Sequence, residues 1–491
     1  IIASRRGAEF VDLEKGLHSI NNWVRGTCHY GMMPANGFLY VPPHACVCYI
    51  NEKLNGFIAL APQIPPQFKS RVSKGASRVE RGTAFGRVDE RKATADDWVT
   101  YRYDSMRTCA TETQVPRKLK ALWDIKLGGR LTPPIVADGK VFISQIDQHH
   151  VIALDANNGK VLWEFTAGGR VNVPPTYYRG MVLFGAADGW VYCVRASDGE
   201  LIWRFRGAPQ DRRVCVYGQL ESAHPVNSGV LVQNGIAYFA AGRSSHLDGG
   251  IYLYGVDPMT GKLLHTAHVE GPELNVKNTT DNINPTQGAL TDILEGDGQL
   301  IFMRHLKFDS ELRLTSAKER MPRVQAVGGF LDDTYFKRAP WFIGARANWG
   351  RLIVANDGQT AYCVRMFKSL HCLDPKNFFT PGKDGYTLLA MNLQNPKKPL
   401  WSKSIPVRVK AMVACGKLLW IAGAPDVINP RDPFAAFEGR AGAVLWAFST
   451  ESGERVAEYK LHTPPVFNGI SAAHGRLYIA TRDGRLVCMG R

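Results

Sequence analysis

The chain has 491 residues, of which 45% are hydrophobic and 21% are charged, and its formal net charge is +16. The hydrophobic fraction is typical of a globular protein with a large core. No run of 18 apolar residues occurs, which excludes a transmembrane helix. The positive charge leaves two interpretations open, a solvated basic surface or attraction to a polyanion such as an acidic polysaccharide. Nucleic acid is not favoured as a partner, because the aromatic residues follow strand patterns instead of the basic runs.

Residues 1–60 show strand signals separated by turns. Residues 1–24 read as strand, turn and strand, and residues 28–60 supply three further strands around the hairpin dipeptide Asn36-Gly37. The chain starts at Ile1 without an apolar signal segment, so we expect a mature product or a fragment. We predict that residues 1–60 form an N-terminal blade or the end of an upstream propeller.

Residues 61–97 are basic and polar, with few large apolar side chains. This composition predicts a long exposed linker, or a strap across the surface of the following domain. A basic binding tail is the functional alternative. From residue 98 onward the strand signals return and continue to the end of the chain, so residues 98–491 are predicted to form one domain.

The stretch from Gly139 to Trp203 contains the same pattern twice. Each half has an apolar strand, a polar turn, a second strand, an Asx/Gly turn and a third strand that ends in tryptophan. Trp163 and Trp203 lie about 40 residues apart, which is the spacing of a four-stranded propeller blade. We interpret both tryptophans as packing anchors of the blades.

A single strand around Trp123 lacks the rest of its blade, whereas Pro464–Gly490 supplies three strands before the chain stops. We predict that these strands share one sheet and close the ring, because closure removes open sheet edges. Blades are expected to begin near Thr132, Asn172, Ser222, Leu290, Trp341, Arg408 and Pro464. These make seven, and residues 28–60 could add an eighth. The predicted fold class is therefore an all-β propeller of four-stranded blades, with eight preferred to seven.

Ten cysteines occur, several of them within apolar strands, where cysteine acts as a small hydrophobic residue. Cys363 and Cys372 flank a short segment and could be bridged across a hairpin. No CxxCH motif is present, so no c-type haem is expected, and no paired CxxC motif predicts a structural zinc site.

The run D-x-x-x-G-K-x-x-W at Asp155–Trp163 resembles the repeat of PQQ-type propellers, the quinoprotein-dehydrogenase-like fold. The stretches NNWVRGTCHYGMMPANG, QLESAHPV, YFAAGRSSHLDGGIYLYGVDP, GFLDDTYFKRAPW and DPFAAFEGRAGAVLWA resemble the large PQQ-like repeat proteins of planctomycete-type bacteria. This resemblance implies an exported propeller of the PQQ-binding-like or assembly-factor-like kind. Quinoprotein dehydrogenases use adjacent cysteines, a calcium ion and an aspartate base. Cys46-Val47-Cys48 is not an adjacent pair, and no residues match the calcium ligands, so neither PQQ nor calcium is supported by a motif.

The densest polar and aromatic cluster lies in GFLDDTYFKRAPW. Its members are Asp332, Asp333, Tyr335, Lys337, Arg338 and Trp341. The two carboxylates could hold a hard cation or act as an acid and base, and Tyr335 with Arg338 could act on a uronic acid as a lyase does. The alternative is a structural loop whose charges pair with one another.

A second set of candidates precedes the predicted innermost strands, where side chains point toward the mouth of a central channel. They are Glu221, His224, Arg130, Asn172, Arg408 and Asn468. Such a ring suits a polar or anionic ligand, and the alternative is a polar plug in the channel. Arg243 and Asp248 are interpreted as an ion pair across a turn.

Two functional hypotheses follow. The first is a secreted or periplasmic propeller that acts as a binding scaffold for a protein or acidic glycan partner, with no catalysis of its own. The second is an enzyme with a site at the channel mouth, either lyase-like on acidic glycans or a degenerate dehydrogenase dependent on PQQ and calcium. Because no catalytic constellation is identified, the first hypothesis is favoured.

Overall fold

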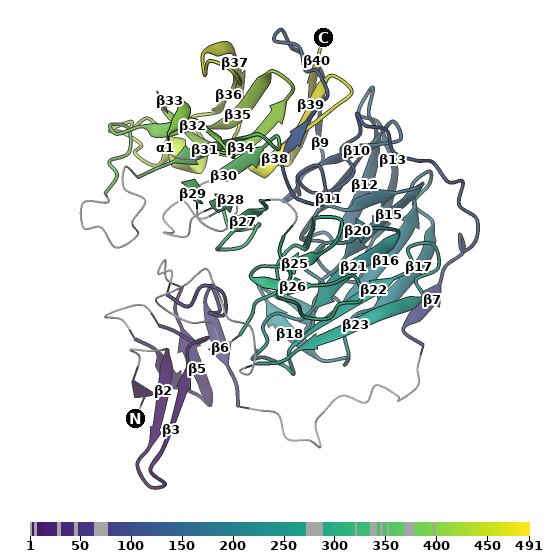
Figure 1. Ribbon diagram of the computed structural model, residues 1–491, viewed down its shortest axis with the longest axis vertical. Coiled ribbons are helices and arrows are strands. Elements are labelled where there is room, and N and C mark those ends of the chain that lie inside the picture. The colour runs from purple at the N-terminus through teal and green to yellow at the C-terminus, as the bar shows by residue number, and fades with distance from the viewer. Residues whose placement is uncertain are drawn as a thin grey trace.

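The computed structural model describes residues 2–3, 7–26, 31–43, 48–62, 77–271, 288–319, 322–333, 341–343, 347–350, 353–367, 378–395 and 398–491. Within these residues the regular structure is β-sheet, apart from the single-turn helix α1 (Ala435–Glu438) (Figure 1). No helix in this part of the chain is long and apolar enough to span a membrane. The predicted all-β class is confirmed.

Half of the strands in the described residues belong to antiparallel sheets in which four consecutive strands pair in chain order. These sheets are β10 (Ile135–Ala137), β11 (Lys140–Gln145), β12 (His150–Asp155) and β13 (Val161–Thr166); β14 (Thr176–Tyr178), β15 (Met181–Gly185), β16 (Trp190–Arg195) and β17 (Leu201–Arg206); β20 (Leu231–Gln233), β21 (Ile236–Ala241), β22 (Ile251–Val256) and β23 (Leu263–Val269); β30 (Ile353–Asn356), β31 (Thr360–Arg365), β32 (Tyr386–Asn392) and β33 (Pro399–Ile405); and β34 (Val407–Cys415), β35 (Leu418–Pro425), β36 (Ala443–Ser449) and β37 (Arg455–Leu461). This order is that of a propeller blade.

Two three-stranded sheets lie between the β20–β23 and β30–β33 sheets in the chain. They are β24 (Glu295–Gly296), β25 (Ile301–Met303) and β26 (Leu306–Phe308), and β27 (Val324–Ala326), β28 (Trp341–Ile343) and β29 (Ala347–Gly350). Trp341 therefore lies in the second strand of its sheet, and the prediction that a blade begins there was wrong. Between Leu290 and β34 the chain forms three sheets, β24–β26, β27–β29 and β30–β33. The sequence predicted only two blades in this region.

The sheets are stacked face to face, which explains the sequence pattern of their strands. The middle strands are covered on both faces, so Val141, Phe142 and Ile143 of β11 are fully buried and form an unbroken apolar run. The fourth strands face solvent on one side. In β13, Trp163 is therefore the one buried residue, and the other side chains are exposed or half-buried. First strands of successive sheets also lie beside one another, β38 beside β10, β10 beside β14, β14 beside β20 and β20 beside β24.

The predicted pairing of the two distant segments is present. Strands β38 (Pro465–Ala473), β39 (Arg476–Thr481) and β40 (Arg485–Gly490) form one sheet with β9 (Lys120–Lys126). Strand β40 pairs antiparallel with β9, with Cys488 opposite Trp123 and Leu486 opposite Ile125. Figure 1 shows β9 beside the yellow C-terminal strands. This sheet has the same four-stranded form as the others, although its strands come from distant parts of the chain.

A tryptophan in the fourth strand of several sheets docks on a turn of the next sheet. The indole nitrogens donate hydrogen bonds from Trp123 to Ala156 O (3.1 Å), Trp163 to Ala196 O (3.0 Å), Trp203 to Pro258 O (3.0 Å) and Trp401 to Thr450 O (2.8 Å). The indole also covers the turn glycine: a Cβ added at Gly199 would lie 2.7 Å from Trp163 Cε3. The aspartate of the repeat, such as Asp155, accepts backbone N–H groups of the same turn. The prediction that Trp163 and Trp203 are packing anchors is confirmed.

The described residues between 2 and 60 include two small sheets, which lie below the main body in Figure 1. The first holds β1 (Ile2–Ala3), β2 (Ala8–Asp12) and β3 (Leu17–Asn21), and the second holds β4 (Met33–Ala35), β5 (Phe38–Val41) and β6 (Ile58–Leu60). A small core of Ala8, Val24 and Val41 joins them. Contacts with the main body include stacking of Trp23 on His246, with ring centroids 5.4 Å apart, and the bond from Leu290 N to Asn51 O (3.1 Å). Whether this unit is a domain of its own stays a prediction.

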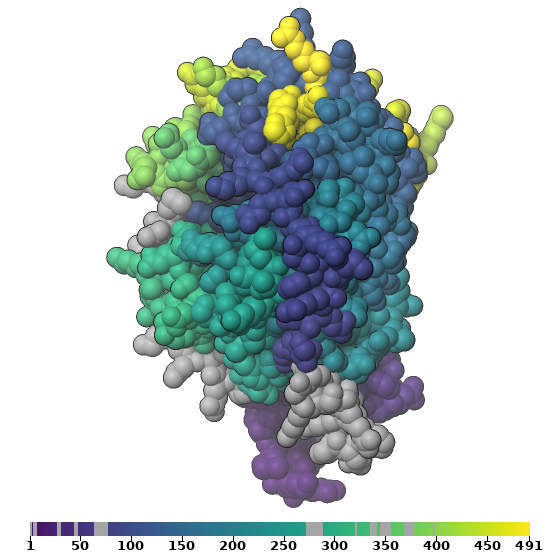
Figure 2. All heavy atoms as spheres, turned by 90° about the vertical axis from the view of Figure 1, so that its right-hand side faces the viewer, coloured from purple at the N-terminus to yellow at the C-terminus, as the bar shows by residue number. Residues whose placement is uncertain are grey.

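Residues 77–96, which we call the strap, cross the outside of the main body (Figure 2). Their strand β7 (Val79–Arg81) adds to the outer edge of β17, with Arg81 opposite Trp203. Arg78 then bonds Tyr254 of β22, and Arg91 O accepts from the hydroxyl of Tyr177 in β14. The strap therefore covers an edge that would otherwise present unpaired backbone groups.

The cysteines of the described residues carry free thiols, among them Cys363. The hypothesis that Cys363 is bridged to Cys372 was therefore wrong. Cys363 lies fully buried in β31, where its side chain packs as a small apolar group.

Candidate functional site

Residues 97–115, which we call the axial segment, lie along the first strands of several sheets. Its backbone is bonded to one sheet after another: Trp98 pairs with Val136 of β10, and Val99 O accepts from Tyr177 N of β14. Ser105 O, Thr108 O and Cys109 O accept from the backbone N–H groups of β24, β30 and β34. Strand β8 (Ala110–Thr111) lies parallel to β34 on the edge away from β35. One segment thus joins first strands that are far apart in sequence.

The innermost side chains of the axial segment are Tyr101 and Arg102, each 2% exposed. Arg102 donates to Asn468 Oδ1 (2.6 Å) and to Arg107 O (2.9 Å), and its guanidinium lies 5.0 Å from the ring centroid of Trp341. Asn468 in turn donates to the Tyr101 hydroxyl, which donates to Phe330 O (3.0 Å). Burial raises the pKa of Tyr101, so the phenol stays protonated and keeps its donor.

Asn468 was predicted at the channel mouth, and it lies at the point where β38 meets the axial segment. Its backbone has a positive φ of 55°. Both polar atoms of its amide are bonded to the axial segment, so its hydrogen-bonding capacity is directed at the chain itself. A polar residue near a predicted inner strand indicated Asn468 as a candidate. The same sequence pattern did not identify Arg102 as its partner.

Arg107 is the second buried guanidinium of the axial segment, with 1% exposure. It donates to Leu294 O from both Nε (3.1 Å) and Nη2 (2.8 Å), and to Thr100 Oγ1 (2.9 Å). Burial lowers the pKa of Arg107 to about 10, against the opposing effect of Asp104 and Glu295. The group remains a cation at neutral pH and holds the segment against β24.

A cluster of buried charges adjoins Arg107 at the β24–β26 sheet. Arg323 donates to Glu295 Oε1 (2.9 Å) with both side chains 3% exposed, and Arg304 lies 3.6 Å from Asp292. Burial raises the pKa of Glu295 to about 8, because desolvation outweighs the attraction of Arg323. Burial with nearby arginines lowers the pKa of His305 to about 3, so this imidazole is neutral. Sequence reasoning missed the cluster, since its members are scattered over 30 residues of loops and short strands.

A chain of alternating charges links loops of the sheets β10–β13, β14–β17 and β20–β23. Asp147 accepts from Arg130 (2.6 Å) and from Arg170 (2.9 Å). Arg170 also pairs with Glu221 (2.9 Å), and Glu221 pairs with Arg243 (3.0 Å). Hydrogen bonds from Arg130 lower the pKa of Asp147 to about 2. Glu221 and Arg130 were predicted candidates; Arg170 and Asp147, which connect them, were missed.

Arg170 also fixes an inserted hairpin, β18 (Arg213–Val216) and β19 (Gln219–Ser222). Its guanidinium donates to Val216 O (2.9 Å) and Tyr217 O (3.0 Å), the two carbonyls at the hairpin tip. The side chain of Tyr217 is 88% exposed beyond them. The blade predicted to begin near Ser222 therefore begins later, at β20, and the residues before it form this hairpin.

Of the remaining channel-mouth candidates, Arg408 lies in β34, whereas His224 and Asn172 lie in loops. His224 is buried and its Nε2 lies 2.9 Å from Asp248 O, and burial lowers the pKa of its imidazole. Arg408 is bonded to Tyr386 (3.1 Å) and Asp426 (3.2 Å). Asn172 Nδ2 donates to Asn227 Oδ1 (3.0 Å). Whether these side chains bind a ligand stays a prediction.

The Asp332–Trp341 cluster is described only at its ends. Asp333 meets Lys410 of β34, with Nζ 3.2 Å from Oδ2, and burial lowers the pKa of Lys410. Tyr335, Lys337 and Arg338 lie outside the described residues. The ion pair expected between Arg243 and Asp248 was wrong, because Arg243 pairs with Glu221 and Asp248 pairs with Arg212.

Two cavities flank Tyr103 and Asp104 where the axial segment reaches one face of the molecule. The larger, of about 860 Å³, is lined by Asn356, Asp357, Gln359 and other polar residues beside β30 and β34. The smaller, of about 390 Å³, adjoins β14 and β20. Asp104 between them accepts from the N–H and hydroxyl of Thr108, so its carboxylate is used in holding the turn.

The quinoprotein-like fold raises the question of whether these residues fit PQQ and calcium. The axis is filled by Tyr101, Arg102 and Arg107, whose polar atoms bond other parts of the chain. The buried carboxylates Asp292 and Glu295 face arginines, which repel a cation. Among the described residues no group of three or more His, Cys, Asp and Glu side chains is placed to hold a metal ion. The residues described here do not fit a quinone with its calcium.

Comparisons with known proteins agree with this fold. Residues 115–304 match the PQQ_2 family model, described as outer membrane protein assembly factor BamB. The matched residues and the four-stranded sheets are consistent with a PQQ-like repeat β-propeller. A search of curated proteins finds no match. The narrower resemblance to planctomycete-type proteins stays a prediction.

Similar solved structures include two dehydrogenases and an assembly factor. Quinohemoprotein alcohol dehydrogenase ADHIIG from Pseudomonas putida HK5 is 14% identical with a TM-score of 0.47, covering 81% of this chain and 80% of that one. The quinohemoprotein alcohol dehydrogenase from Comamonas testosteroni is 14% identical with a TM-score of 0.47, covering 81% of both chains. BamB from Moraxella catarrhalis is 11% identical with a TM-score of 0.35, covering 76% of this chain and 98% of that one.

Proposed function

We propose that the protein is an exported binding scaffold that presents its surface to an anionic partner, either a protein or an acidic glycan, and carries out no chemistry of its own. The observation that supports this most is the axial segment. It carries buried arginines whose donors are directed at other parts of the chain. The net charge of +16 favours a partner of negative charge.

The architecture that goes with this function is a closed ring of eight blades formed by residues 98–491. Seven blades would be β10–β13, β14–β17, β20–β23, β24–β26, β27–β29, β30–β33 and β34–β37, and the eighth would be β38–β40 with β9. Contacts of β30 with β34 and of β34 with β38 support the same order. The eighth blade then comes from the residues after Leu290 instead of residues 28–60.

Thermal unfolding of the purified protein with added ligands tests the function. A ligand that binds the folded state raises the unfolding midpoint by mass action. We expect no rise with PQQ and Ca²⁺ together, and a rise with a polyanionic partner such as an acidic oligosaccharide. A rise with PQQ and Ca²⁺, or oxidation of an alcohol in their presence, would contradict the scaffold and support the degenerate dehydrogenase.

The lyase alternative has less support. Asp333, one of its two carboxylates, is paired with Lys410. A lyase would split acidic oligosaccharides with formation of an unsaturated product, which absorbs in the ultraviolet. We expect no such product when the purified protein is incubated with oligogalacturonate.

A further inference from the structure

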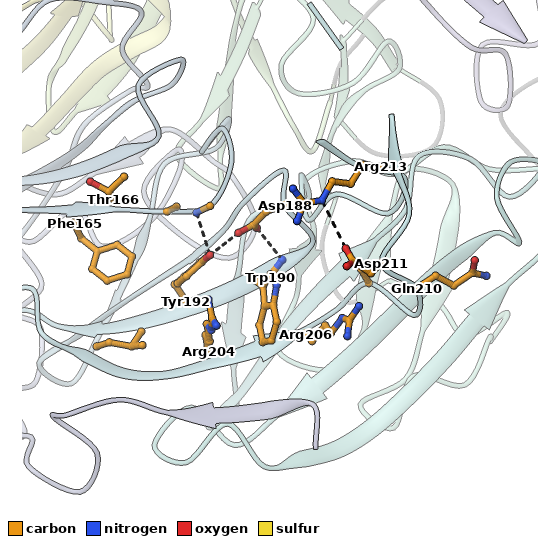
Figure 3. Close-up of a pocket in the computed structure, with 14 residues that line it drawn as sticks. Phe165, Thr166, Asp188, Trp190, Tyr192, Arg204, Arg206, Gln210, Asp211 and Arg213 are labelled. Atoms are coloured by element: carbon orange, nitrogen blue, oxygen red, sulfur yellow. Dashed lines mark hydrogen bonds and ion pairs between the residues drawn. The ribbon is translucent and has the colours of Figure 1, made fainter. Parts of the chain in front are cut away.

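A pocket of about 570 Å³ lies between two neighbouring sheets, away from the axial segment (Figure 3). One wall is the end of β13, at Phe165 and Thr166, and the other is formed by β16 and β17. The loop that leads from β17 into the β18–β19 hairpin completes it with Gln210, Asp211 and Arg213. The side chains of Asp211 and Arg213 are about two-thirds exposed, so the pocket is open to solvent. Its size is that of a typical small-ligand site.

One side of the pocket carries positive charge next to an aromatic ring. In Figure 3, Arg204, Trp190 and Arg206 follow one another along this side. Arg204 is held in place, because its Nε and Nη2 both donate to Glu80 of the strap (2.8 and 2.5 Å) and its guanidinium lies 4.4 Å from the Trp190 ring centroid. The guanidinium of Arg206 forms no hydrogen bond or ion pair with the described residues. Arg206 is therefore available to an anion.

The other side of the pocket carries a hydrogen-bond acceptor. Asp188 accepts from the Tyr192 hydroxyl (2.5 Å) and from Trp190 N (3.1 Å). A carboxylate offers about four lone-pair sites, so Asp188 retains acceptor capacity toward the pocket. Arg213 is only weakly engaged, with its Nε 3.7 Å from Asp211. The pocket thus combines the guanidinium of Arg206 and the weakly paired guanidinium of Arg213 with a fixed carboxylate acceptor.

This combination selects among anionic ligands. An inorganic anion such as sulfate brings acceptors alone, and the carboxylate of Asp188 would repel it. An acidic peptide brings N–H donors but offers no apolar ring face to Trp190. A uronic acid brings a carboxylate for the guanidinium groups, hydroxyl donors for Asp188 and an apolar ring face for Trp190. We propose that this pocket binds a uronic acid residue of an acidic oligosaccharide, with Arg206 and Arg213 taking the carboxylate and Asp188 taking a sugar hydroxyl. This inference rests on the proposed scaffold function and names the glycan class that it would bind.

Isothermal titration calorimetry of the full chain with trigalacturonate tests the proposal. We expect binding by the native protein and a loss of about tenfold in affinity in Arg206→Gln, which removes one charge-assisted contact. The matched control is Arg179→Gln, which removes the same charge from an exposed turn of the same sheet, where Arg179 pairs with Glu90. The affinity of this control variant should equal that of the native protein. Circular dichroism confirms that both variants fold.

Several results would overturn the proposal. These are absence of trigalacturonate binding, equal binding by Arg206→Gln and the native protein, equal binding of a neutral trisaccharide, or preference for a triglutamate peptide. Each of them leaves the scaffold function standing, since that function also allows an anionic protein as the partner and is tested by the response to PQQ and Ca²⁺ and to other polyanions. Conversely, stabilisation by PQQ and Ca²⁺ would remove the scaffold function, and the response of Arg206→Gln to trigalacturonate would still decide the pocket.

Discussion

Glu295 illustrates how one buried carboxylate can make the stability of the whole protein depend on pH. Its pKa is about 8 in the folded state, whereas the ordinary value is 4.5. Between these two values the folded state holds a proton that the unfolded state has lost. The free energy of unfolding therefore falls as pH rises through this range, by about 1.4 kcal/mol per pH unit for one such group. The stabilisation of the folded state by this proton is complete below pH 4.5 and is lost above about pH 8.

The variant Glu295→Gln should be less sensitive to pH than the native protein. Glutamine resembles the protonated acid, so we expect the two proteins to have similar stability near pH 5 and the variant to be more stable by a few kcal/mol near pH 8. Urea unfolding at pH 5, 6.5 and 8 measures this. Glu454→Gln, at an exposed position paired with Lys403, is the control and should follow the native curve. Equal pH dependence in Glu295→Gln and the native protein would contradict the assignment.

Arg170 gives a second prediction at the scale of the residue. Its side chain is 5% exposed, and its removal leaves Glu221, 4% exposed, with one partner fewer. Substitution by methionine should cost about 3–5 kcal/mol, the usual effect of breaking a buried ion pair. Arg130→Gln removes the exposed member of the same chain of charges and should cost at most about 1 kcal/mol. Denaturant unfolding compares the two, and similar losses would show that the chain of charges is not organised around Arg170.

At the scale of the element, the contact between a tryptophan and the glycine of the next sheet is what the repeat sequence encodes. Gly199 has a positive φ of 76° and lies under the ring of Trp163. Gly139 has a similar φ of 69°, but an added Cβ there meets nothing within 4 Å. The two glycines therefore separate the cost of backbone strain from the cost of lost packing.

We expect Gly139→Ala to destabilise the protein by about 1–2 kcal/mol, the cost of a left-handed backbone conformation. Gly199→Ala should cost a further 1–3 kcal/mol or so, because the new Cβ displaces the Trp163 ring in a packed core. Thermal or urea unfolding of both variants measures the difference. Equal losses would mean that the tryptophan yields without cost and is not an anchor.

The sequence predicted those elements whose signal is local and repeated. In the repeat Asp155–Trp163, the aspartate and glycine form one turn, and the tryptophan docks on a turn of the next sheet. The repeat therefore predicted the four-stranded sheets directly. The site was predicted less completely. Asn468 and Glu221 were found as polar residues before inner strands, but their partners Arg102 and Arg170 lie in other segments, and no local pattern connects them. The short strands β24–β29 were merged for the same reason, since they carry too few residues for a pattern to develop.

At the scale of the whole molecule, the pairing of β40 with β9 joins segments 361 residues apart, as the bond between Arg485 and Asp124 shows. Truncation after Gly484 removes β40, exposes the edge of β9 and uncovers the apolar surface beneath Leu486 and Cys488. We expect a large fall in the thermal midpoint and increased aggregation, because two open sheet edges are created. The control is Arg485→Gln, which removes only the exposed pair with Asp124. A truncated protein as stable as the control would contradict this role of β40.

The axial segment also sets a limit on the order of events during synthesis. Asp97 contacts His474, which lies 377 residues further along the chain, so at about 5–20 residues per second this partner leaves the ribosome roughly 20–75 s later. Until then Arg102 lacks its partner Asn468, and for about the first half of that time Arg107 also lacks Leu294 O. The nascent protein must therefore carry an incomplete interior, with Arg102 still hydrated, while most of these residues are synthesised, and this period is when a chaperone would be of most use to it.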